Sequence, residues 1–341
     1  MTLKEIAKEA GVSISTVSRV INNKNYHCSS PETEKIIWEL VRKTGYIPNE
    51  TAKNLKAIST DGGTAAAKKR VISCLFPRTD INAQDQFFSA IERGVEKAAM
   101  GSGCTLGYSF SAIDVLDNID EKFFSRSDLD GIVVLGRFSE KLMTFFKNHT
   151  KNVVLVGLNV FSTQFDQVYV NGYKAAMKAL GYLYNLGHRS IAYLGEVNNE
   201  VRFTAYLDFM KEHDLPVEPH QIWDCILSLQ GGLAAGEKLL QAGQLPTALF
   251  CANDITAIGA MKAFRQAHLH IPDDISVISI DDIEMAQFIT PSLTTIHIPK
   301  TELGKMVVKI LMDRMDKGHS LKLRLELPCD LIIRNSCKRI G

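Results

Sequence analysis

The sequence predicts a small all-α head with a helix-turn-helix, followed by a larger α/β body built on two doubly wound parallel sheets. Three observations carry this prediction. Apolar residues recur at helical spacing over residues 2–41, small polar residues fill 59–67, and short apolar runs alternate with amphipathic segments from residue 71 onward. A chain of 341 residues also exceeds what one hydrophobic core usually holds, so more than one domain is expected.

The first helix of the head begins at a capping box and has one apolar face. Thr2 and Glu5 have the spacing at which a hydroxyl and a carboxylate bond the orphan amides of a helix start. The apolar face comprises four residues at i, i+3, i+4 and i+7: Leu3, Ile6, Ala7 and Ala10. Gly11 then supplies a tight turn, and Ser13 can cap a second helix.

The second helix presents two different faces. Its apolar residues, which can pack inside the head, are Val17, Val20 and Ile21. Its other face offers short side chains and one long cation, namely Ile14, Ser15, Thr16 and Arg19. Such a face suits insertion into a major groove, where a guanidinium can bond a guanine edge in two places. The sequence therefore predicts a DNA-binding helix-turn-helix.

A third helix and a linker complete the head. Ser30 before Pro31 has the cap-then-proline order of a helix start. The buried face of this helix is expected to comprise Ile36, Ile37, Leu40 and Val41. Residues 49–58 could form one more short helix, which would be marginal without packing. Residues 59–70 are a linker, because the stretch 59–67 is small, polar and without periodicity.

The body alternates apolar runs of buried-strand length with amphipathic segments. The expected strands are 71–76, 131–135, 153–156, 191–194, 248–251 and 275–280. Candidate helices between them include 89–99, 173–185, 232–241 and 256–267. Such alternation implies parallel sheets covered on both faces. Two such sheets fit the length, and a ligand would lie in the crevice at the carboxyl ends of their strands.

The distribution of charge favours nucleic acid at one end of the chain. The formal net charge is only +1, but residues 1–60 hold nine Lys/Arg against six Asp/Glu. A basic head on a mildly acidic body fits attraction of phosphates at the head alone.

The sequence shows no motif that indicates catalysis, metal binding or cofactor binding. There is no P-loop and no Rossmann fingerprint after a strand, and the adjacent Asp281 and Asp282 point apart rather than forming an acid/base pair. The seven cysteines include no C-x-x-C pair, so neither zinc nor a disulfide framework is expected. No signal-type stretch or run of about 18 apolar residues occurs. We expect a cytoplasmic protein that is not an enzyme, needs no cofactor and contacts no membrane.

Several sequence strings resemble the lac/galactose/purine repressor family of bacterial transcriptional regulators. In the head they are Val-Ser-Ile-Ser-Thr-Val-Ser-Arg-Val at 12–20, Ser-Pro-Glu-Thr at 30–33 and Gly-Tyr-Ile-Pro-Asn at 45–49. In the body they are 187–195, 250–254, 275–282 and 291–296, which follow in the family's order. The resemblance therefore covers essentially the whole chain.

The resemblance implies a particular division of the chain. A helix-turn-helix headpiece with a hinge helix would span 1–58, and an effector-binding and dimerisation domain of periplasmic-binding-protein type would span 71–341. Lobe one would comprise about 71–157 and 297–325, and lobe two about 158–296 and 326–341. The chain would cross between the lobes three times, near residues 158, 293 and 325.

The resemblance also assigns roles in DNA binding. Base reading falls to Ile14, Ser15 and Arg19, and phosphate contacts fall mainly to Thr16, Tyr46 and Asn49. In the hinge helix, Leu55 would wedge into the minor groove with Lys56 beside it. An apolar wedge that unstacks one base step bends the duplex and adds preference for deformable sequences.

For the effector pocket, three polar residues are expected to converge. Arg202 matches the family's ligand-gripping arginine, Asp281 ends an apolar strand, and Asn253 opens a helix after another strand. By approximate register, the further pocket members are Phe76, Asp80, Phe87, Arg137 and Leu227. A carboxylate and a guanidinium at these strand ends can hold the vicinal hydroxyls of a sugar.

The expected function is therefore repression of carbohydrate-utilisation genes under control of a small sugar or sugar phosphate. A homodimer is expected, because paired headpieces must reach operator half-sites about 34 Å apart. One alternative is a regulator with effector-independent or protein-partner control. A second alternative is a sugar-binding transport receptor, which shares the two-lobed architecture but has no use for residues 1–58.

Overall fold

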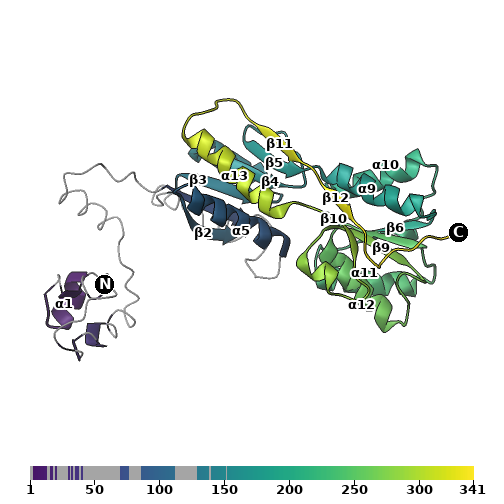
Figure 1. Cartoon of the computed structure of the whole chain (residues 1–341), viewed down its shortest axis with the longest axis horizontal. Coiled ribbons are helices and arrows are strands. Elements are labelled where there is room, and N and C mark those ends of the chain that lie inside the picture. The colour runs from purple at the N-terminus through teal and green to yellow at the C-terminus, as the bar shows by residue number, and fades with distance from the viewer. Residues whose placement is uncertain are drawn as a thin grey trace. The chain divides into compact units, whose positions relative to one another are not determined.

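The computed structural model describes residues 3–13, parts of 16–40, and 70–76, 86–111, 129–137, 140–150 and 152–341. The chain divides into two compact units, Met1–Lys68 and Lys69–Gly341. Each unit is described by itself below, and Figure 1 gives the element labels.

The first unit is a small helical cluster. Helix α1 spans Leu3–Glu9, and Gly11 follows it with a φ of +66°, a conformation that glycine adopts without strain. Ser13 caps the next helix, because its hydroxyl accepts a hydrogen bond from the amide of Thr16 at 3.1 Å. The core contains Ile6, Ala7, Val17, Val20 and Ile37. Ile36, expected in the buried face of the third helix, is instead 45% exposed.

The second unit contains two six-stranded sheets. The first has the order β11-β5-β4-β3-β1-β2, and all its neighbouring strands are parallel. Its strands are β1 (Val71–Phe76), β2 (Thr105–Ser111), β3 (Gly131–Leu135), β4 (Val153–Gly157), β5 (Asp166–Val170) and β11 (Arg324–Leu327). The second has the order β12-β10-β9-β8-β6-β7. Its strands are β6 (Ile191–Gly195), β7 (Ile222–Asp224), β8 (Ala248–Cys251), β9 (Ser276–Asp281), β10 (Thr294–His297) and the antiparallel edge strand β12 (Asp330–Ile332).

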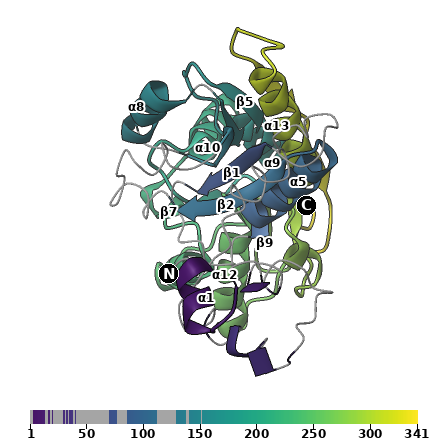
Figure 2. The ribbon, with the colours of Figure 1, turned by 90° about the vertical axis from the view of Figure 1, so that its left-hand side faces the viewer.

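Helices cover both faces of the first sheet, as alternation along its strands requires. Ile132 and Val134 of β3 point to the cluster that contains Phe146 of helix α8 (Glu140–His149). Val133 and Leu135 point to the other side, where helices α5 (Gln86–Gly101) and α13 (Lys300–Met315) pack. Figure 2 shows α8 and the α5–α13 pair on opposite sides of the sheet.

The second sheet is covered in the same manner. Helices α9 (Gly172–Asn185) and α10 (Val201–Glu212) pack together, and α11 (Leu229–Gln241) packs against α12 (Asp254–Gln266). The two pairs lie on opposite faces of the sheet (Figure 1). Short 3-10 turns at Pro219–Gln221 and Glu284–Gln287 complete this lobe.

The first of the three crossings between the lobes differs from the expected place. Strand β5 belongs to the first sheet, so this crossing follows Val170 rather than residue 158. The second crossing lies between His297 and Lys300 and the third between Leu327 and Asp330, each within a few residues of the expected 293 and 325. Among the described residues, lobe one is therefore built from those between 70 and 170 and from 300–327, and lobe two from 172–297 and 330–341.

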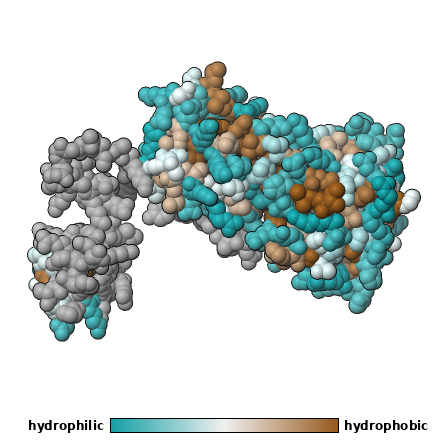
Figure 3. Space-filling view, in the orientation of Figure 1, coloured by the Kyte–Doolittle hydropathy of each residue, from teal (hydrophilic) through white to brown (hydrophobic). Residues whose placement is uncertain are grey.

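On the face of the second unit that Figure 3 shows, hydrophilic residues surround several hydrophobic areas. The exposed apolar side chains include Met100, Phe288 and Leu321. Within the part of the chain that the structure describes, no helix is both long and apolar enough to cross a membrane.

Candidate functional site

A cavity of about 380 Å³ lies between the two lobes of the second unit. It is lined by Phe87, Phe88, Leu135, Gly136, Arg137, Gly157, Leu158, Asn159, Glu196, Arg202, Ile226, Leu227, Asn253 and Asp281. Most of these residues end or directly follow the parallel strands β3, β4, β6, β7, β8 and β9. The cavity thus occupies the crevice at the carboxyl ends of the strands, where α/β folds bind their ligands.

Arg202 enters the cavity from the first turn of α10 and is 6% exposed. Its guanidinium bonds Glu200 in bidentate fashion, with Nε to Oε1 at 2.7 Å and Nη2 to Oε2 at 2.8 Å. Its Nη1 donates to the carbonyl of Ala252 at 2.7 Å. Burial alone would lower the pKa of Arg202, but the Glu200 carboxylate raises it above its ordinary value. Arg202 is therefore a fixed cation.

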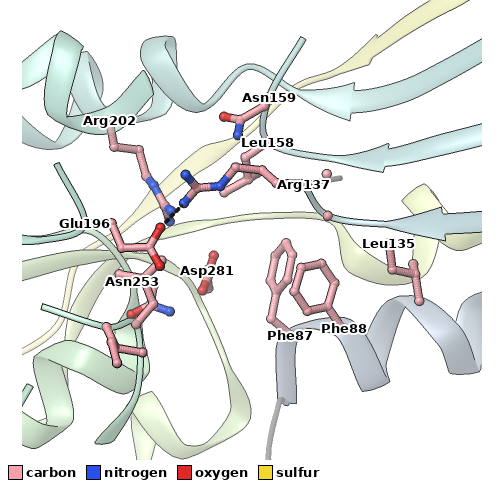
Figure 4. A pocket seen from close by; sticks show the side chains of 14 residues that line it. Phe87, Phe88, Leu135, Arg137, Leu158, Asn159, Glu196, Arg202, Asn253 and Asp281 are labelled. Atoms are coloured by element: carbon pink, nitrogen blue, oxygen red, sulfur yellow. Dashed lines mark hydrogen bonds and ion pairs between the residues drawn. The ribbon is translucent and has the colours of Figure 1, made fainter. Parts of the chain in front are cut away.

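Arg137 reaches the same carboxylate from the other lobe. It follows β3 of lobe one, and its Nη2 donates to Glu196 Oε2 and to Glu200 Oε2, each at 2.6 Å. Its Nη1 donates to the carbonyls of Asn198 and Asn199 at 3.4 and 3.1 Å. Figure 4 shows the guanidiniums of Arg137 and Arg202 converging above Glu196. The two lobes are thus joined by an ion-pair bridge across the cavity.

Glu200, at the centre of this bridge, is 2% exposed and is the N-cap of α10. Burial would raise its pKa, but the guanidiniums of Arg202 and Arg137 lower it to about 2. Glu200 is therefore ionised at neutral pH.

Asp281 ends β9 and is 4% exposed. Its φ of +129° is one that residues other than glycine rarely adopt, so the surrounding structure must hold it. On one side, Lys300 Nζ bonds the carbonyl oxygens of Asp281 and Asp282. On the other side, the buried carboxylate of Asp254 accepts from Ser279 Oγ at 2.6 Å and from the amide of Ile283 at 2.8 Å. These contacts fix the strand end that presents the Asp281 carboxylate.

Asn253 is the N-cap of α12, and its Oδ1 accepts from the amide of Thr256 at 3.1 Å. Opposite these polar groups, Phe87 and Phe88 stand at the start of α5, with ring centroids 5.1 Å apart and planes at 77° (Figure 4). The cavity therefore combines an apolar wall with polar groups on the facing side, an arrangement typical of small-molecule sites.

Six of the eight expected pocket residues line this single cavity: Phe87, Arg137, Arg202, Leu227, Asn253 and Asp281. Phe76 does not. It is buried at the end of β1 and packs edge-on against Phe88 at 6.4 Å, so it supports the aromatic wall from behind. Asp80 lies outside the described residues.

The sequence reasoning missed eight lining residues: Phe88, Leu135, Gly136, Gly157, Leu158, Asn159, Glu196 and Ile226. A uniform search of the residues after each predicted strand would have found most of them, because Gly136, Asn159 and Glu196 occupy such positions. The bridging residue Glu200 was also missed.

The candidate DNA interface lies in the first unit. Of the expected DNA contacts only Thr16 is described, at a helix start, with its hydroxyl 2.8 Å from that of Ser13. The other expected contacts lie outside the described residues: Ile14, Ser15, Arg19, Tyr46, Asn49, Leu55 and Lys56. A two-lobed ligand-binding unit in one chain with a helix-turn-helix unit defines a DNA-binding regulator with an effector domain.

Comparisons with known proteins support the assignment as a DNA-binding regulator with an effector domain. Residues 2–49 match the family described as bacterial regulatory proteins, lacI family, and residues 180–337 match a periplasmic binding protein-like domain. The HTH-type transcriptional repressor PurR of Vibrio campbellii is 31% identical over 353 residues, which cover 100% of this chain and 99% of that protein. The chain belongs to the lacI family of bacterial regulatory proteins. It is a transcriptional repressor and not an enzyme, and the transport-receptor alternative is wrong.

Two solved structures share the fold over the full length. A complex of the transcriptional regulator CelR with cellobiose matches with a TM-score of 0.71 and 22% identity, covering 98% of this chain and 99% of that one. A lac repressor dimer bound to operator and the anti-inducer ONPF matches with a TM-score of 0.71 and 23% identity, covering 99% of each chain. These relatives bind operator DNA as a dimer in one case and a sugar in the other.

Proposed function

We propose that this repressor controls carbohydrate-utilisation genes, and that a small sugar or sugar phosphate bound in the inter-lobe cavity sets its affinity for the operator. The observation that carries the proposal is the pairing of Phe87 and Phe88 with Arg202, Asn253 and Asp281 around one cavity. Aromatic faces pack against the C–H faces of a sugar ring, while amide, guanidinium and carboxylate groups bond its hydroxyls. The cellobiose complex of a relative with the same fold supports this effector class.

For the DNA side, we propose that residues 1–58 form the headpiece and 59–70 the linker, and that the protein acts as a cytoplasmic homodimer on a near-palindromic operator. Base reading is proposed for Ile14, Ser15 and Arg19, phosphate contacts for Thr16, Tyr46 and Asn49, and minor-groove insertion for Leu55 with Lys56 beside it. The lac repressor dimer on its operator supports this arrangement.

The test has two stages. A thermal-shift screen of neutral sugars, sugar phosphates and nucleobases against the full chain should identify compounds that stabilise it, since a ligand that binds only the folded state raises its stability. Operator fragments should then be selected from random DNA and titrated with and without each hit. We expect a sugar to shift both the melting transition and operator affinity. Stabilisation by nucleobases alone would contradict the sugar assignment, and operator binding unaffected by any hit would favour effector-independent control.

A further inference from the structure

We propose that the inter-lobe cavity selects an uncharged effector, and that Glu200 is the specificity-determining residue that excludes anionic ligands such as sugar phosphates and sugar acids. The inference rests on the proposed function and narrows its effector class to neutral ligands. Without Glu200, the guanidiniums at the cavity would favour an anion.

The two guanidiniums at the cavity are already engaged by protein groups. A guanidinium has five N–H donors. Hydrogen bonds from Arg202 use its Nε, Nη1 and Nη2, and those from Arg137 run from Nη1 and Nη2 to two carboxylates and two carbonyls. The positive charge of both guanidiniums is therefore already paired with Glu196 and Glu200, and a phosphate or carboxylate on the ligand would compete with these two carboxylates.

Glu200 occupies the position that a ligand anion would take. The N-terminus of a helix attracts anions through its free amides and its dipole. At α10 the Oε1 of Glu200 already accepts from the amide of Arg202 at 3.1 Å as well as from its side chain. This carboxylate thus lies between two guanidiniums and a helix N-terminus, as a phosphate does in many phosphate sites. Because it belongs to the protein, a second anion there would be repelled.

The remaining charges around the cavity also disfavour an anionic ligand. Glu196 and Asp281 line the cavity and Glu200 is buried beside it, so three carboxylates accompany two guanidiniums there. The second helix that begins at the cavity, α12, carries Asp254 in its first turn and has its N-cap side chain bonded to its own amide. The ammonium of Lys300 lies behind the strand end, bonded to backbone carbonyls of Asp281, Asp282 and Ile298.

Neutral ligands are not repelled by these carboxylates. The Oδ1 of Asn253 is used in capping, so its amide nitrogen is left to donate to a hydroxyl. Asp281 and Glu196 supply carboxylate acceptors, which bond hydroxyl donors well, and Phe87 and Phe88 supply apolar faces. A polyol matches this set of donors and acceptors, whereas an anionic ligand would bring like charges into contact.

The experiment is calorimetry on the full chain with matched ligands. Galactose is compared with galactose 6-phosphate and galacturonate, glucose with glucose 6-phosphate and glucuronate, and cellobiose with its 6′-phosphate. For the wild type we expect a neutral sugar to bind about a hundredfold or more tightly than its anionic counterparts. In Glu200→Gln this ratio should fall about tenfold or more, because the competing carboxylate is lost. Glu212→Gln, at the exposed end of the same helix, removes an equal charge away from the cavity and should keep the wild-type ratio.

Glu200→Gln leaves Arg202 without its charged partner, so its melting transition is measured first. If the Glu200→Gln variant does not fold, Glu196→Gln is used instead, because the Glu196 side chain also pairs with Arg137 but is 19% exposed, against 1% for Glu200. It should shift the ratio in the same direction by a smaller factor. Wild-type binding of a sugar phosphate as tight as its neutral sugar would overturn the inference and leave the proposed function standing. If the protein binds neither neutral nor anionic sugars, both the proposed function and the inference are overturned.

Discussion

Arg137, after a strand of lobe one, donates to the same Glu200 carboxylate that Arg202 of lobe two holds in bidentate fashion, with an Nη2–Oε2 distance of 2.6 Å. The Glu200 carboxylate is thereby shared between the lobes. The bridge is nearly dry, since the Glu200 side chain is 1% exposed and that of Arg137 is 16% exposed. Hydrogen bonds between charged groups are strongest in such surroundings.

Replacing Arg137 by glutamine should therefore destabilise the second unit. We expect a loss of about 1–3 kcal/mol in the free energy of unfolding, because Glu196 loses its bridge while Glu200 keeps Arg202. Urea unfolding followed by circular dichroism measures this. Arg265→Gln, at an exposed position on α12, is the matched control and should cost less than about 0.5 kcal/mol. Equal effects of the two variants would mean that the bridge contributes nothing in solution.

Asp281→Asn should abolish the response to effector and leave operator affinity in its absence nearly intact. An effector shifts an equilibrium only by its differential affinity for the two arrangements, so loss of the carboxylate removes the shift. Asparagine is preferred to alanine because it removes the charge and keeps the shape of the side chain. The hydrogen bond from Lys300 is to the backbone carbonyl of residue 281 and is retained in the variant. Operator release by the identified inducer checks this, and wild-type release would place the ligand elsewhere.

Arg19→Ala should weaken specific operator binding far more than binding to random DNA. Base contacts specify a sequence, whereas phosphate contacts hold any duplex. The expected loss on the operator is about 1–3 kcal/mol. Fluorescence anisotropy at one fixed salt concentration, with operator and random duplexes in parallel, measures both affinities. An equal loss on the two duplexes would assign Arg19 to the backbone.

Protonation of His319 should stabilise lobe one below neutral pH. Its hydrogen bond to Asp313, and a second one to Asp166 at 3.0 Å, raise its pKa above the ordinary value of 6.5. Because the folded-state pKa is the higher one, the stabilisation is fully present below pH 6.5 and is lost as the pH rises through the raised value. His319→Gln should therefore lower the melting temperature more at pH 6 than at pH 9. A deficit independent of pH would show that the imidazolium is not the stabilising form.

The central strands could be predicted because they are unbroken apolar runs, such as 131–135 and 248–251. The edge strands could not. Strand β11 is only Arg-Leu-Glu-Leu, and β2 contains a glycine and two serines, because an edge strand has one neighbour and needs less apolar surface. Strand β5 was missed because it begins with Asp166 and Gln167, both buried. The backbone of Phe161, six residues earlier, satisfies Gln167, whereas Asp166 is satisfied by Arg314, which is 148 residues away and cannot be found from a local pattern.

The residues of the site likewise divide into those that could be predicted from the sequence and those that could not. Asp281 and Asn253 could be predicted, because polar residues at the ends of apolar strands must face the crevice. The role of Glu200 could not, since an acidic residue before a helix normally indicates only a cap. Its second contact comes from Arg137, which is 63 residues away in sequence and in the other lobe.

Lys300 is the first residue of α13, the helix that opens the return of the chain to lobe one, yet its ammonium bonds carbonyls at the end of β9 in lobe two. The strand end that presents Asp281 and the helix that begins at Lys300 are thereby fastened at one atom. A single ammonium thus couples the strand end that carries Asp281 to the start of a helix that packs against α5 and β4 of lobe one.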